Sequence, residues 1–341
     1  MGGGLNGRIL IGHDLFENII SLENLFLAWK EFKRGKMGKH DVQEFALSLE
    51  DNLFYLNSQL RNLSYRHSAY SSFYVSDPKL RHIHKACVRD RVLHHAVFRV
   101  LCPIFEKDFI FDSYSCRVGK GTHRAISRLA NFLNKASQND SKNIFVVKLD
   151  VRKFFDSVSH NILMAIIRRR INETRITWLL NEIIVESYSK ENGLGLPIGN
   201  VTSQLFANIY LNELDQFVKH NLKKELYIRY CDDFILVART PEELKGFISD
   251  TKEFLRDRLG LDLHKDKIII RKYRQGIDFL GYVALPHCRV LRTKTKRRIL
   301  GNVARNGQNQ KSIQSYLGLL SHGNTHKIKT KLMNLIESSS S

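Results

Sequence analysis

Hydrophobic residues recur at helical spacing through the first part of the chain. Leu22, Leu25, Phe26 and Trp29 would share one face of a helix, and a second run of the same kind extends over 42–60. A stretch rich in Lys and Gly separates the two runs. We therefore expect helices on both sides of this stretch.

Further along, the pattern changes to the alternation of a β-strand. Residues 70–75 alternate in this way, Asp77-Pro78 interrupts the pattern, and residues 81–83 are a candidate partner strand for a hairpin. Helical periodicity returns after this hairpin. It predicts two helices, over 90–105 and 122–133.

The second half of the chain contains two segments that predict buried strands next to acidic residues. The apolar run 144–149 ends at Asp150, and residues 227–237 predict a strand, a turn and a strand with Asp232 and Asp233 at the tip. The order of elements favours an α+β fold, in which a sheet carries helices on one face. The other expected elements are helices over 161–170, 176–188, 202–220 and 241–259, a loop over 193–199, strands over 267–271 and 279–284, and basic helices from about residue 291.

Charge adds the first indication of a partner. The 341 residues include 54 Lys and Arg against 34 Asp and Glu, which gives a formal net charge of +20. An excess of this size attracts a polyanion, because binding to phosphates releases condensed counterions. Nucleic acid is the favoured partner, and a basic protein with no special partner is the alternative. The length suits one large domain or two to three packed subdomains.

The cysteines and the first residues indicate a cellular location. The five Cys residues are widely spaced and form no CxxC pair, so neither a zinc knuckle nor a disulfide framework is predicted. The chain starts with neither a signal peptide nor a convincing myristoylation site, and no apolar run is long enough to cross a bilayer. We expect a cytoplasmic protein with reduced thiols and no membrane partner.

The acidic residues form the pattern that carries chemistry. Asp150 closes an apolar strand, and the adjacent Asp232 and Asp233 interrupt a hairpin whose flanks are β-formers. Adjacent carboxylates repel each other, and a bound dication is the simplest reason to place them there. Mg²⁺ prefers carboxylate oxygens, and two such ions can activate a 3′-hydroxyl and stabilise a leaving pyrophosphate. The alternative is a solvated acidic turn, which the apolar flanks disfavour.

These motifs resemble those of reverse transcriptases. Tyr230-Cys-Asp-Asp233 resembles the YxDD box, and Leu149-Asp-Val-Arg-Lys-Phe-Phe-Asp156 resembles the metal-binding box before it. The segment 195–210 is similar to the template- and nucleotide-facing box, and Phe279-Leu-Gly281 is similar to the primer grip. The boxes follow the order of the family across about 70–285. The resemblance implies a right-hand polymerase with fingers, palm and thumb and an antiparallel palm sheet backed by helices.

The particular residues in these boxes narrow the resemblance to one group of reverse transcriptases. Pro197-Ile-Gly199 with Ser203-Gln204 resembles the enzymes of diversity-generating retroelements rather than group II introns, and 113–123 and 312–323 look similar to that group as well. An intron-type or phage-defence reverse transcriptase is the alternative. A non-catalytic RNA-binding scaffold is a further alternative, which the intact acidic residues disfavour.

The resemblance assigns catalysis and metal binding to four residues. Asp150, Asp232 and Asp233, with the backbone carbonyl of Val151, would hold two Mg²⁺ ions, for which Mn²⁺ can substitute. The implied division of the chain is a helical extension over 1–68, fingers over 69–145, a palm over 146–285 with interleaved fingers elements, and a thumb with a tail over 286–341.

The resemblance also implies contacts with the incoming dNTP. Phe155 would block a ribose 2′-hydroxyl, with Phe154 as its competitor, since the alternation of a strand turns only one of them to the site. Arg81 would bind the triphosphate with two hydrogen bonds, and Lys79 is the competing candidate for this role. The alternative without a function is a solvated basic hairpin. The remaining candidates are Gly199, which lets backbone approach the base pair, Gln204, and Lys267, whose alternative is a surface lysine.

A last set of residues is expected to contact template or primer. Arg89 and Arg91 flank Asp90, which is a candidate helix cap, and Arg117 is favoured over Lys120 in a glycine-containing loop. The basic C-terminal helix would contact phosphates without reading sequence. The full set is Arg89, Arg91, Arg117, Lys120, Ile198, Ser203, Gly281, Lys296 and Arg297.

The retroelement resemblance implies a biological role and partners. The enzyme would copy a template-repeat RNA with errors at adenines, and the cDNA would replace part of a target gene in mutagenic retrohoming. Its partners would be template RNA, primer or cDNA, dNTPs and a basic, ring-forming accessory variability protein. A bacterial, archaeal or phage origin is implied.

Overall fold

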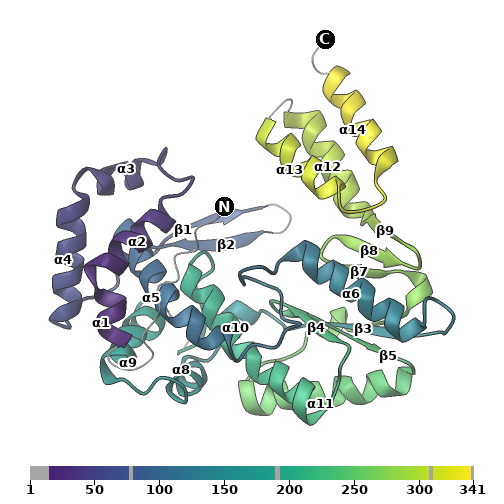
Figure 1. The fold of residues 1–341 in the computed structure, drawn as a ribbon, viewed down its shortest axis with the longest axis horizontal. Coiled ribbons are helices and arrows are strands. Elements are labelled where there is room, and N and C mark those ends of the chain that lie inside the picture. The colour runs from purple at the N-terminus through teal and green to yellow at the C-terminus, as the bar shows by residue number, and fades with distance from the viewer. Residues whose placement is uncertain (1–14, 77–79, 189–192, 307–309, 339–341) are drawn as a thin grey trace, which may run out of the picture. The chain divides into compact units, whose positions relative to one another are not determined.

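A computed structural model of the chain describes residues 15–76, 80–188, 193–306 and 310–338 (Figure 1). The chain forms two compact units. Unit 1 comprises 1–109, 153–213 and 256–261, and unit 2 comprises 110–152, 214–255 and 262–341. No helix in the described part of the chain is both long enough and apolar enough to cross a membrane.

The helices of unit 1 pack around α5 (Val88–Glu106). Contacts join α5 to each of the N-terminal helices α1 (Leu15–Ile20), α2 (Leu22–Phe32), α3 (His40–Leu47) and α4 (Leu49–Arg61). The predicted helical runs on both sides of the Lys- and Gly-rich stretch are therefore confirmed. The buried Asn24 amide donates to the carbonyl oxygens of Ile19 at 2.9 Å and Ala96 at 3.2 Å, which ties α2 to α5.

A two-stranded hairpin follows the N-terminal helices. Strands β1 (Ser71–Val75) and β2 (Arg81–Lys85) pair antiparallel, with Ser71 opposite Lys85, so the predicted hairpin is confirmed. Unit 1 is completed by α7 (Phe154–Ser157), α8 (His160–Arg168), α9 (Thr174–Asn181), the π-helical turn η1 (Glu182–Glu186) and most of α10 (Val201–Gln216).

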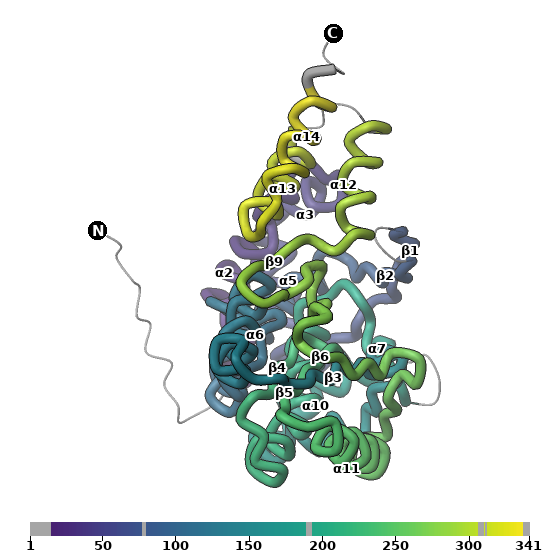
Figure 2. Tube along the Cα trace, turned by 90° about the vertical axis from the view of Figure 1, so that its right-hand side faces the viewer, coloured from purple at the N-terminus to yellow at the C-terminus, as the bar shows by residue number. Residues whose placement is uncertain are grey.

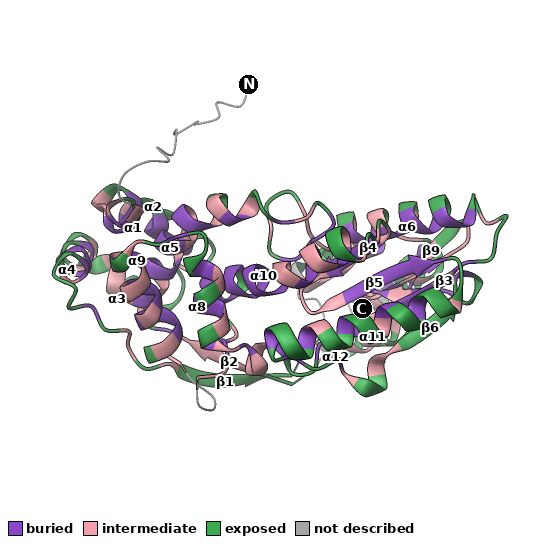
Figure 3. Cartoon of the chain, turned by 90° about the horizontal axis from the view of Figure 1, so that it is seen from below, coloured by how far each residue is buried: buried purple, intermediate pink, exposed green. Residues whose placement is uncertain are grey.

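Unit 2 is built on a four-stranded antiparallel sheet. The strand order is β4 (Tyr227–Tyr230), β5 (Asp233–Ala238), β3 (Phe145–Asp150) and β6 (Ile269–Lys272). Figure 3 shows that β5 is buried along almost its whole length, as expected for an inner strand with apolar residues on both faces. The predicted strand–turn–strand over 227–237 is confirmed.

Helices contact both faces of this sheet, so the expectation of helices on one face was wrong. Helix α6 (Thr122–Ser137) shares a core with Ile228 and Ile235, whereas Phe247 of α11 (Pro241–Leu259) lies against the ring of Tyr227. Successive residues of a strand point to opposite faces, and Tyr227 and Ile228 are adjacent. Apolar residues therefore occupy both faces of β4.

A smaller three-stranded sheet follows, formed by β7 (Ile277–Phe279), β8 (Tyr282–Leu285) and β9 (Cys288–Leu291). The single strand predicted over 279–284 was wrong, because Leu280 and Gly281 turn the chain with φ values of 51° and 88°. The predicted basic helices are α12 (Thr293–Asn306), α13 (Gln310–Leu320) and α14 (His326–Ser338), which lie together in both views (Figures 1 and 2).

All five cysteines are free thiols. Cys87 in unit 1 and Cys116 and Cys288 in unit 2 are exposed, while Cys102 and Cys231 are half-buried. Burial, followed by the charge of Asp232, raises the pKa of the Cys231 thiol. The absence of disulfides agrees with the spacing of the cysteines in the sequence.

Candidate active site

Sheet register brings the three predicted catalytic aspartates together in unit 2. Asp150 is the last residue of β3, and it lies opposite Asp233, the first residue of β5. Asp232 occupies the turn between β4 and β5, after Cys231, whose φ of 55° makes the turn tight. The backbone N–H of Val151 donates to the carbonyl oxygen of Asp232 at 3.3 Å. The backbone of Val151, a predicted metal ligand, therefore lies next to this turn.

A buried ion pair, Arg229 with Asp215, stabilises the turn between β4 and β5. The guanidinium of Arg229 on β4 donates to both carboxylate oxygens of Asp215, with a closest distance of 2.6 Å, and both side chains are fully buried. Tyr227 Oη donates to the same carboxylate at 2.8 Å. Arg229 Nη1 also donates to the carbonyl oxygen of Cys231 at 3.1 Å. Arg229 therefore connects the core of unit 2 to the turn that carries Asp232.

Neither Arg229 nor Asp215 is among the residues predicted from the sequence. An arginine in the middle of an otherwise apolar strand is the one signal that would have indicated a buried partner, because arginine is almost never fully buried unless it is paired. Its partner lies on a different element, and no local pattern connects the two. The pair is visible only in the tertiary structure.

Two lysines provide positive charge at the aspartates. Lys267 Nζ lies 2.5 Å from Asp150 Oδ1, and Lys148 Nζ lies 3.5 Å from Asp233 Oδ1. Lys267 belongs to the short 3-10 helix η3 (Lys265–Lys267), which is anchored where the N–H of His264 donates to the carbonyl oxygen of Asp150 at 2.8 Å. Lys267, a predicted dNTP contact, is thus at the acidic site.

Burial and neighbouring carboxylates raise the pKa of Asp232 and of Asp233. Burial, followed by the charge of Asp150, raises the pKa of Asp232. Burial also raises the pKa of Asp233 to about 6, with Lys148 opposing the increase and Asp232 adding to it. Like charges brought together in a partly desolvated place cost free energy, and a cation among them relieves that cost.

The chemistry of these donors fits Mg²⁺. The three aspartates offer hard oxygen ligands, and the raised pKa values of Asp232 and Asp233 express burial and a repulsion that a dication would offset. Among the described residues no group of three or more His, Cys, Asp or Glu side chains is already placed to hold a metal ion, and Asp150 is bonded to Lys267. An open, carboxylate-based arrangement is what Mg²⁺ uses when substrate phosphates complete its ligands.

Phe154 and Phe155 do not lie on a strand, so the argument from strand alternation was wrong. β3 ends at Asp150, and both rings belong to the short helix α7 in unit 1. Phe154 is 2% exposed and packs near Phe155 and Tyr210, whereas Phe155 is half-buried. Phe154 is a core residue, and Phe155 stays the predicted dNTP contact.

The box around Gly199 is attached to the hairpin of unit 1. The N–H of His84 on β2 donates to the carbonyl oxygen of Ile198 at 2.9 Å. Gly199 has a φ of 126°, and a Cβ there would lie 3.1 Å from the carbonyl oxygen of His84. The hairpin alone therefore accounts for the glycine. Ser203 is buried and Gln204 is exposed at the start of α10.

Arg89 and Asp90 form a structural cluster in unit 1. Asp90 is fully buried and accepts hydrogen bonds from Tyr65 Oη at 3.0 Å and the N–H of Ser68 at 2.8 Å. It is not the N-cap of α5, which is Cys87. Arg89 donates to Asp90, Gln59, Ser68 and the carbonyl oxygen of Arg66. The guanidinium of Arg89, a predicted template contact, is therefore hydrogen-bonded within unit 1 itself.

Several predicted contact residues lie elsewhere in the two units. Arg117 Nη1 donates to the carbonyl oxygens of Ile110 and Ser113, and Lys120 Nζ donates to that of Phe111, so both stabilise their own loop. Of the remaining predicted residues, Arg81 is exposed at the start of β2, and Lys79 lies outside the described residues. The carbonyl oxygen of Gly281 accepts a hydrogen bond from the N–H of Arg292. Lys296 and Arg297 lie in the first two turns of α12.

Comparison with known proteins identifies the family. A family model described as "Reverse transcriptase (RNA-dependent DNA polymerase)" matches residues 76–284. Protein YkfC of Escherichia coli (strain K12) is 29% identical over an alignment of 245 residues, and the match covers 61% of this chain and 64% of that protein. The group II intron-encoded protein LtrA of Lactococcus lactis subsp. cremoris is 24% identical over an alignment of 287 residues, and the match covers 64% of this chain and 46% of that protein. The chain thus spans less than two thirds of these relatives.

Solved structures share the fold. Telomerase from Candida albicans in complex with a TWJ fragment of telomeric RNA has a TM-score of 0.51 at 12% identity, over 82% of this chain and 56% of that chain. This likeness agrees with the mixed helix and strand composition and the antiparallel sheets, and the predicted α+β fold of a right-hand polymerase is confirmed. Because the family model matches more than half of its residues, this chain belongs to the reverse transcriptase family.

Proposed function

We propose that the chain is an RNA-directed DNA polymerase of the group II intron-like type, which adds dNTPs to a primer 3′-end on an RNA template. The observation that carries the proposal is the placement of Asp150 opposite Asp233, with Asp232 in the adjoining turn. The family match and the similarity to group II intron-encoded proteins support it. The partners are RNA, primer or cDNA, and dNTPs.

Each group at the site has a distinct task in this reaction. Asp150, Asp232, Asp233 and the carbonyl of Val151 would hold two Mg²⁺ ions, which supply positive charge to the attacking and leaving oxygens. The Lys267 ammonium, 2.5 Å from Asp150, would donate a proton to the leaving pyrophosphate. Arg81 or Lys79 would bind the triphosphate, and Phe155 would exclude ribonucleotides.

Primer extension tests this proposal. Purified protein would receive an RNA template with an annealed DNA primer, four dNTPs and Mg²⁺. We expect full-length cDNA from the wild type and a loss of at least about 10³-fold in rate for Asp232→Ala, in line with the removal of electrostatic stabilisation of a transition state. Asp266→Ala, which removes a carboxylate that is 93% exposed and next to Lys267, should retain activity. Wild-type protein that binds the duplex without extending it would contradict the proposal.

We also propose the finer role in a diversity-generating retroelement. The sequence Pro197-Ile-Gly199 together with Ser203-Gln204 supports this role, while the names of the relatives favour an intron role. The same cDNA, once sequenced, separates the two. Errors concentrated opposite template adenines support the retroelement role, with its accessory variability protein and mutagenic retrohoming. Accurate copying of adenines would favour the intron-like role and leave the polymerase proposal intact.

A further inference from the structure

The two edges of the four-stranded sheet in unit 2 differ in how they are covered. At the β4 edge, the N–H of Arg229 donates to the carbonyl oxygen of Asp112 at 2.9 Å, and the N–H of Tyr114 donates to that of Arg229 at 3.0 Å. Ser113 forms a parallel bridge with Arg229. At the opposite edge, no strand within the described residues pairs with the outer side of β6. The chain itself therefore closes one edge of the sheet and leaves the other open.

The register of β6 identifies the backbone groups that point outward. The N–H of Tyr273 donates to the carbonyl oxygen of Ile144 at 3.1 Å, and these residues lie opposite each other when the β3–β6 register is continued. Hydrogen-bonded and non-hydrogen-bonded pairs alternate along an antiparallel ladder. Arg271 and Ile269 therefore bond to β3, whereas the N–H and C=O of Ile270 point away from the sheet. Ile270 is thus placed to bond with one further strand.

The side chains of β6 combine apolar surface with positive charge. All four residues of the strand are exposed, including Ile269 at 40% and Ile270 at 36%. Arg271 and Lys272 form no ion pair with any described residue. The N–H of Lys272 donates to Gln275 Oε1 at 3.1 Å, which closes the edge at its end. An uncovered edge strand is a ready template for pairing with another chain.

Alternation distributes these side chains over both faces. Successive side chains of a strand point to opposite faces, so Ile269 and Arg271 share one face, while Ile270 and Lys272 share the other. Each face therefore offers one apolar and one cationic side chain. An antiparallel partner with apolar residues opposite the isoleucines and carboxylates opposite the cations has a defined order. From its N-terminus it consists of two acidic residues followed by two apolar residues.

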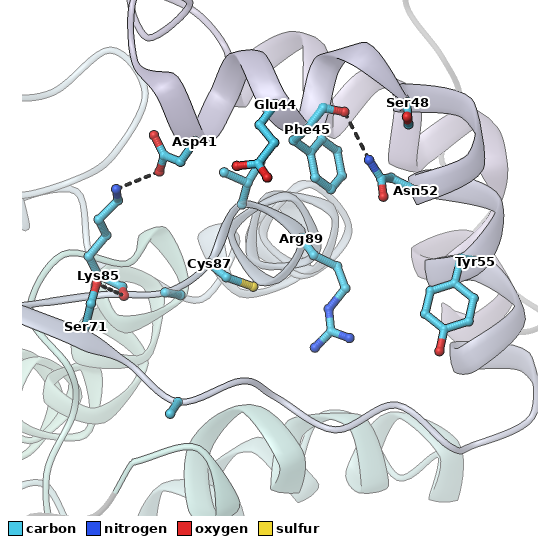
Figure 4. Close-up of a pocket in the computed structure, with 13 residues that line it drawn as sticks. Asp41, Glu44, Phe45, Ser48, Asn52, Tyr55, Ser71, Lys85, Cys87 and Arg89 are labelled. Carbon is cyan, nitrogen blue, oxygen red and sulfur yellow. Dashed lines mark hydrogen bonds and ion pairs between the residues drawn. The ribbon is translucent and has the colours of Figure 1, made fainter.

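The charged groups around a cavity in unit 1 provide a contrast. The cavity has a volume of about 660 Å³, and Figure 4 shows acidic and basic side chains around it. Asp41 pairs there with Lys85 at 2.6 Å, and Arg89 pairs with Asp90 at 2.9 Å. The cations of this cavity have carboxylate partners within unit 1, whereas the cations of β6 have none among the described residues.

A second copy of β6 is a poor match for this edge. The strand Ile-Ile-Arg-Lys contains no carboxylate, so pairing of two copies would leave the cations of both without partners. Like charges on neighbouring strands destabilise a sheet, and charged side chains on edge strands commonly prevent such self-pairing. The same charges favour a strand that carries carboxylates.

We propose that β6 binds an extended segment of a partner protein, which adds to the sheet as a strand and carries two acidic residues followed by two β-branched apolar residues. Main-chain bonds with Ile270 would supply affinity, and side-chain pairs with Arg271 and Lys272 would select the acidic partner. Binding at β6 requires neither template nor dNTP.

A peptide titration of the full chain tests this proposal. The probe is the fluorescein-labelled peptide Thr-Glu-Glu-Val-Val-Thr, blocked at both ends, and fluorescence anisotropy follows its binding. We expect saturable binding with a Kd below about 1 mM. N-methylation of the first Val, which lies opposite Ile270, should weaken binding at least about tenfold, because the carbonyl oxygen of Ile270 loses its donor. N-methylation of the second Val, whose N–H faces away from β6, should change affinity less than about twofold.

Charge variants separate this edge from the general charge of the protein. Arg271→Gln and Lys272→Gln should each weaken peptide binding by about two- to fivefold, the effect of one cross-strand pair of opposite charges. Both side chains are exposed, so both variants should fold. Lys252→Gln removes the same charge from an exposed position of α11 in the same unit, and it should leave peptide affinity unchanged.

Three results would overturn the proposal. The first is the absence of saturable peptide binding up to the stated concentration. The second is equal affinity of the unmodified and both N-methylated peptides, which would show attraction by charge alone; displacement by single-stranded RNA would then assign Arg271 and Lys272 to nucleic acid. The third is a concentration-dependent dimer of the free protein that becomes tighter in Arg271→Gln, which would assign the edge to a second copy of the chain.

Discussion

Two histidines in the core of unit 1 are held neutral by their surroundings. His94 is 2% exposed, its Nδ1 lies 2.5 Å from Thr202 Oγ1, and its Nε2 lies 3.0 Å from His67 Nε2. Desolvation, followed by the charge of His67, lowers the pKa of His94 to about 3. Desolvation also lowers the pKa of His67, although Asp90 opposes the change. A proton on either ring would break this chain of contacts.

This arrangement predicts a loss of stability in mild acid. In the unfolded chain His94 binds a proton below about pH 6.5, whereas in the folded chain it binds one only near pH 3. The unfolded state therefore gains protons first as pH falls. The contribution of neutral His94 to folding stability is complete above pH 6.5 and is lost as pH falls below that value. The loss should approach about 1.4 kcal/mol per pH unit for this group. Urea unfolding at pH 7.5 and 5.5 measures it.

The control for this prediction is His94→Gln, which cannot titrate. The pKa of Asp233 is raised to about 6, so protonation of this group favours the folded protein as pH falls from 7.5 to 5.5. This effect opposes that of His94. The quantity to compare is therefore the change in unfolding free energy with pH in the wild type and in His94→Gln. Equal pH dependence in the two proteins would contradict the prediction.

Among the elements, β4 and the turn after it depend on the Arg229–Asp215 pair. A buried ion pair is strongly destabilising when one partner is removed, by about 3–5 kcal/mol, while replacement of both by apolar residues is often neutral. We expect Asp215→Asn and Arg229→Met to reduce stability by that amount, and Arg229→Met with Asp215→Leu to recover most of it. Chemical unfolding of the three variants measures this.

The same variants separate positioning from stability. Arg229 Nη1 donates to the carbonyl oxygen of Cys231 and so helps to position the turn that carries Asp232. The double variant should therefore be stably folded but have a lower kcat, with little change in KM. Primer extension at varied dNTP concentration gives both parameters. A double variant with wild-type kcat would show that the pair supports the fold alone.

The turn before β7 predicts a contrast between two glycines. Gly276 has a φ of 83°, and a Cβ there would lie 2.7 Å from Val283 Cγ1 on β8, whereas a Cβ at Gly246 in α11 would meet nothing within 4 Å. Gly276→Ala should therefore destabilise by more than about 1 kcal/mol, and Gly246→Ala should stabilise by about 0.5–1 kcal/mol. Thermal unfolding would refute the contrast if both changes had the same sign.

The elements also show how far the sequence predicts the structure. The hairpin over 71–85 and the buried strand that ends at Asp150 follow from local patterns, because alternation and apolar runs are written into consecutive residues. The break at Leu280-Gly281 was missed, since a single glycine in a strand pattern also suits a bulge. The left-handed backbone conformation of Lys153, the N-cap of α7, has no local signal in the sequence either.

The candidate site was predicted in the same uneven way. The three aspartates were found because acidic residues interrupt apolar strands, which is a local signal. The Arg229–Asp215 pair and the buried cluster in which Asp90 is an acceptor each join elements that are distant in sequence. Such contacts are decided by packing, which a single sequence without tertiary information does not display.

At the scale of the whole molecule, the net positive charge should govern the proposed association with nucleic acid. With a net charge of +20 and exposed basic residues such as Lys294 and Arg297 on α12, the protein should bind RNA of unrelated sequence. Affinity should fall by roughly 10³-fold or more between 50 and 200 mM salt if about six or more phosphates are contacted. A filter-binding titration measures this, and an affinity that is independent of salt would contradict it.

The distribution of thiols makes the two units separately addressable. One exposed cysteine, Cys87, lies in unit 1, and after Cys116→Ser one exposed cysteine, Cys288, remains in unit 2. Desolvation and the nearby Asp90 raise the pKa of Cys87, so it should react more slowly with maleimides than an ordinary thiol, and two dyes can be attached in succession. Energy transfer between these dyes then reports the separation of the units directly, with and without bound RNA.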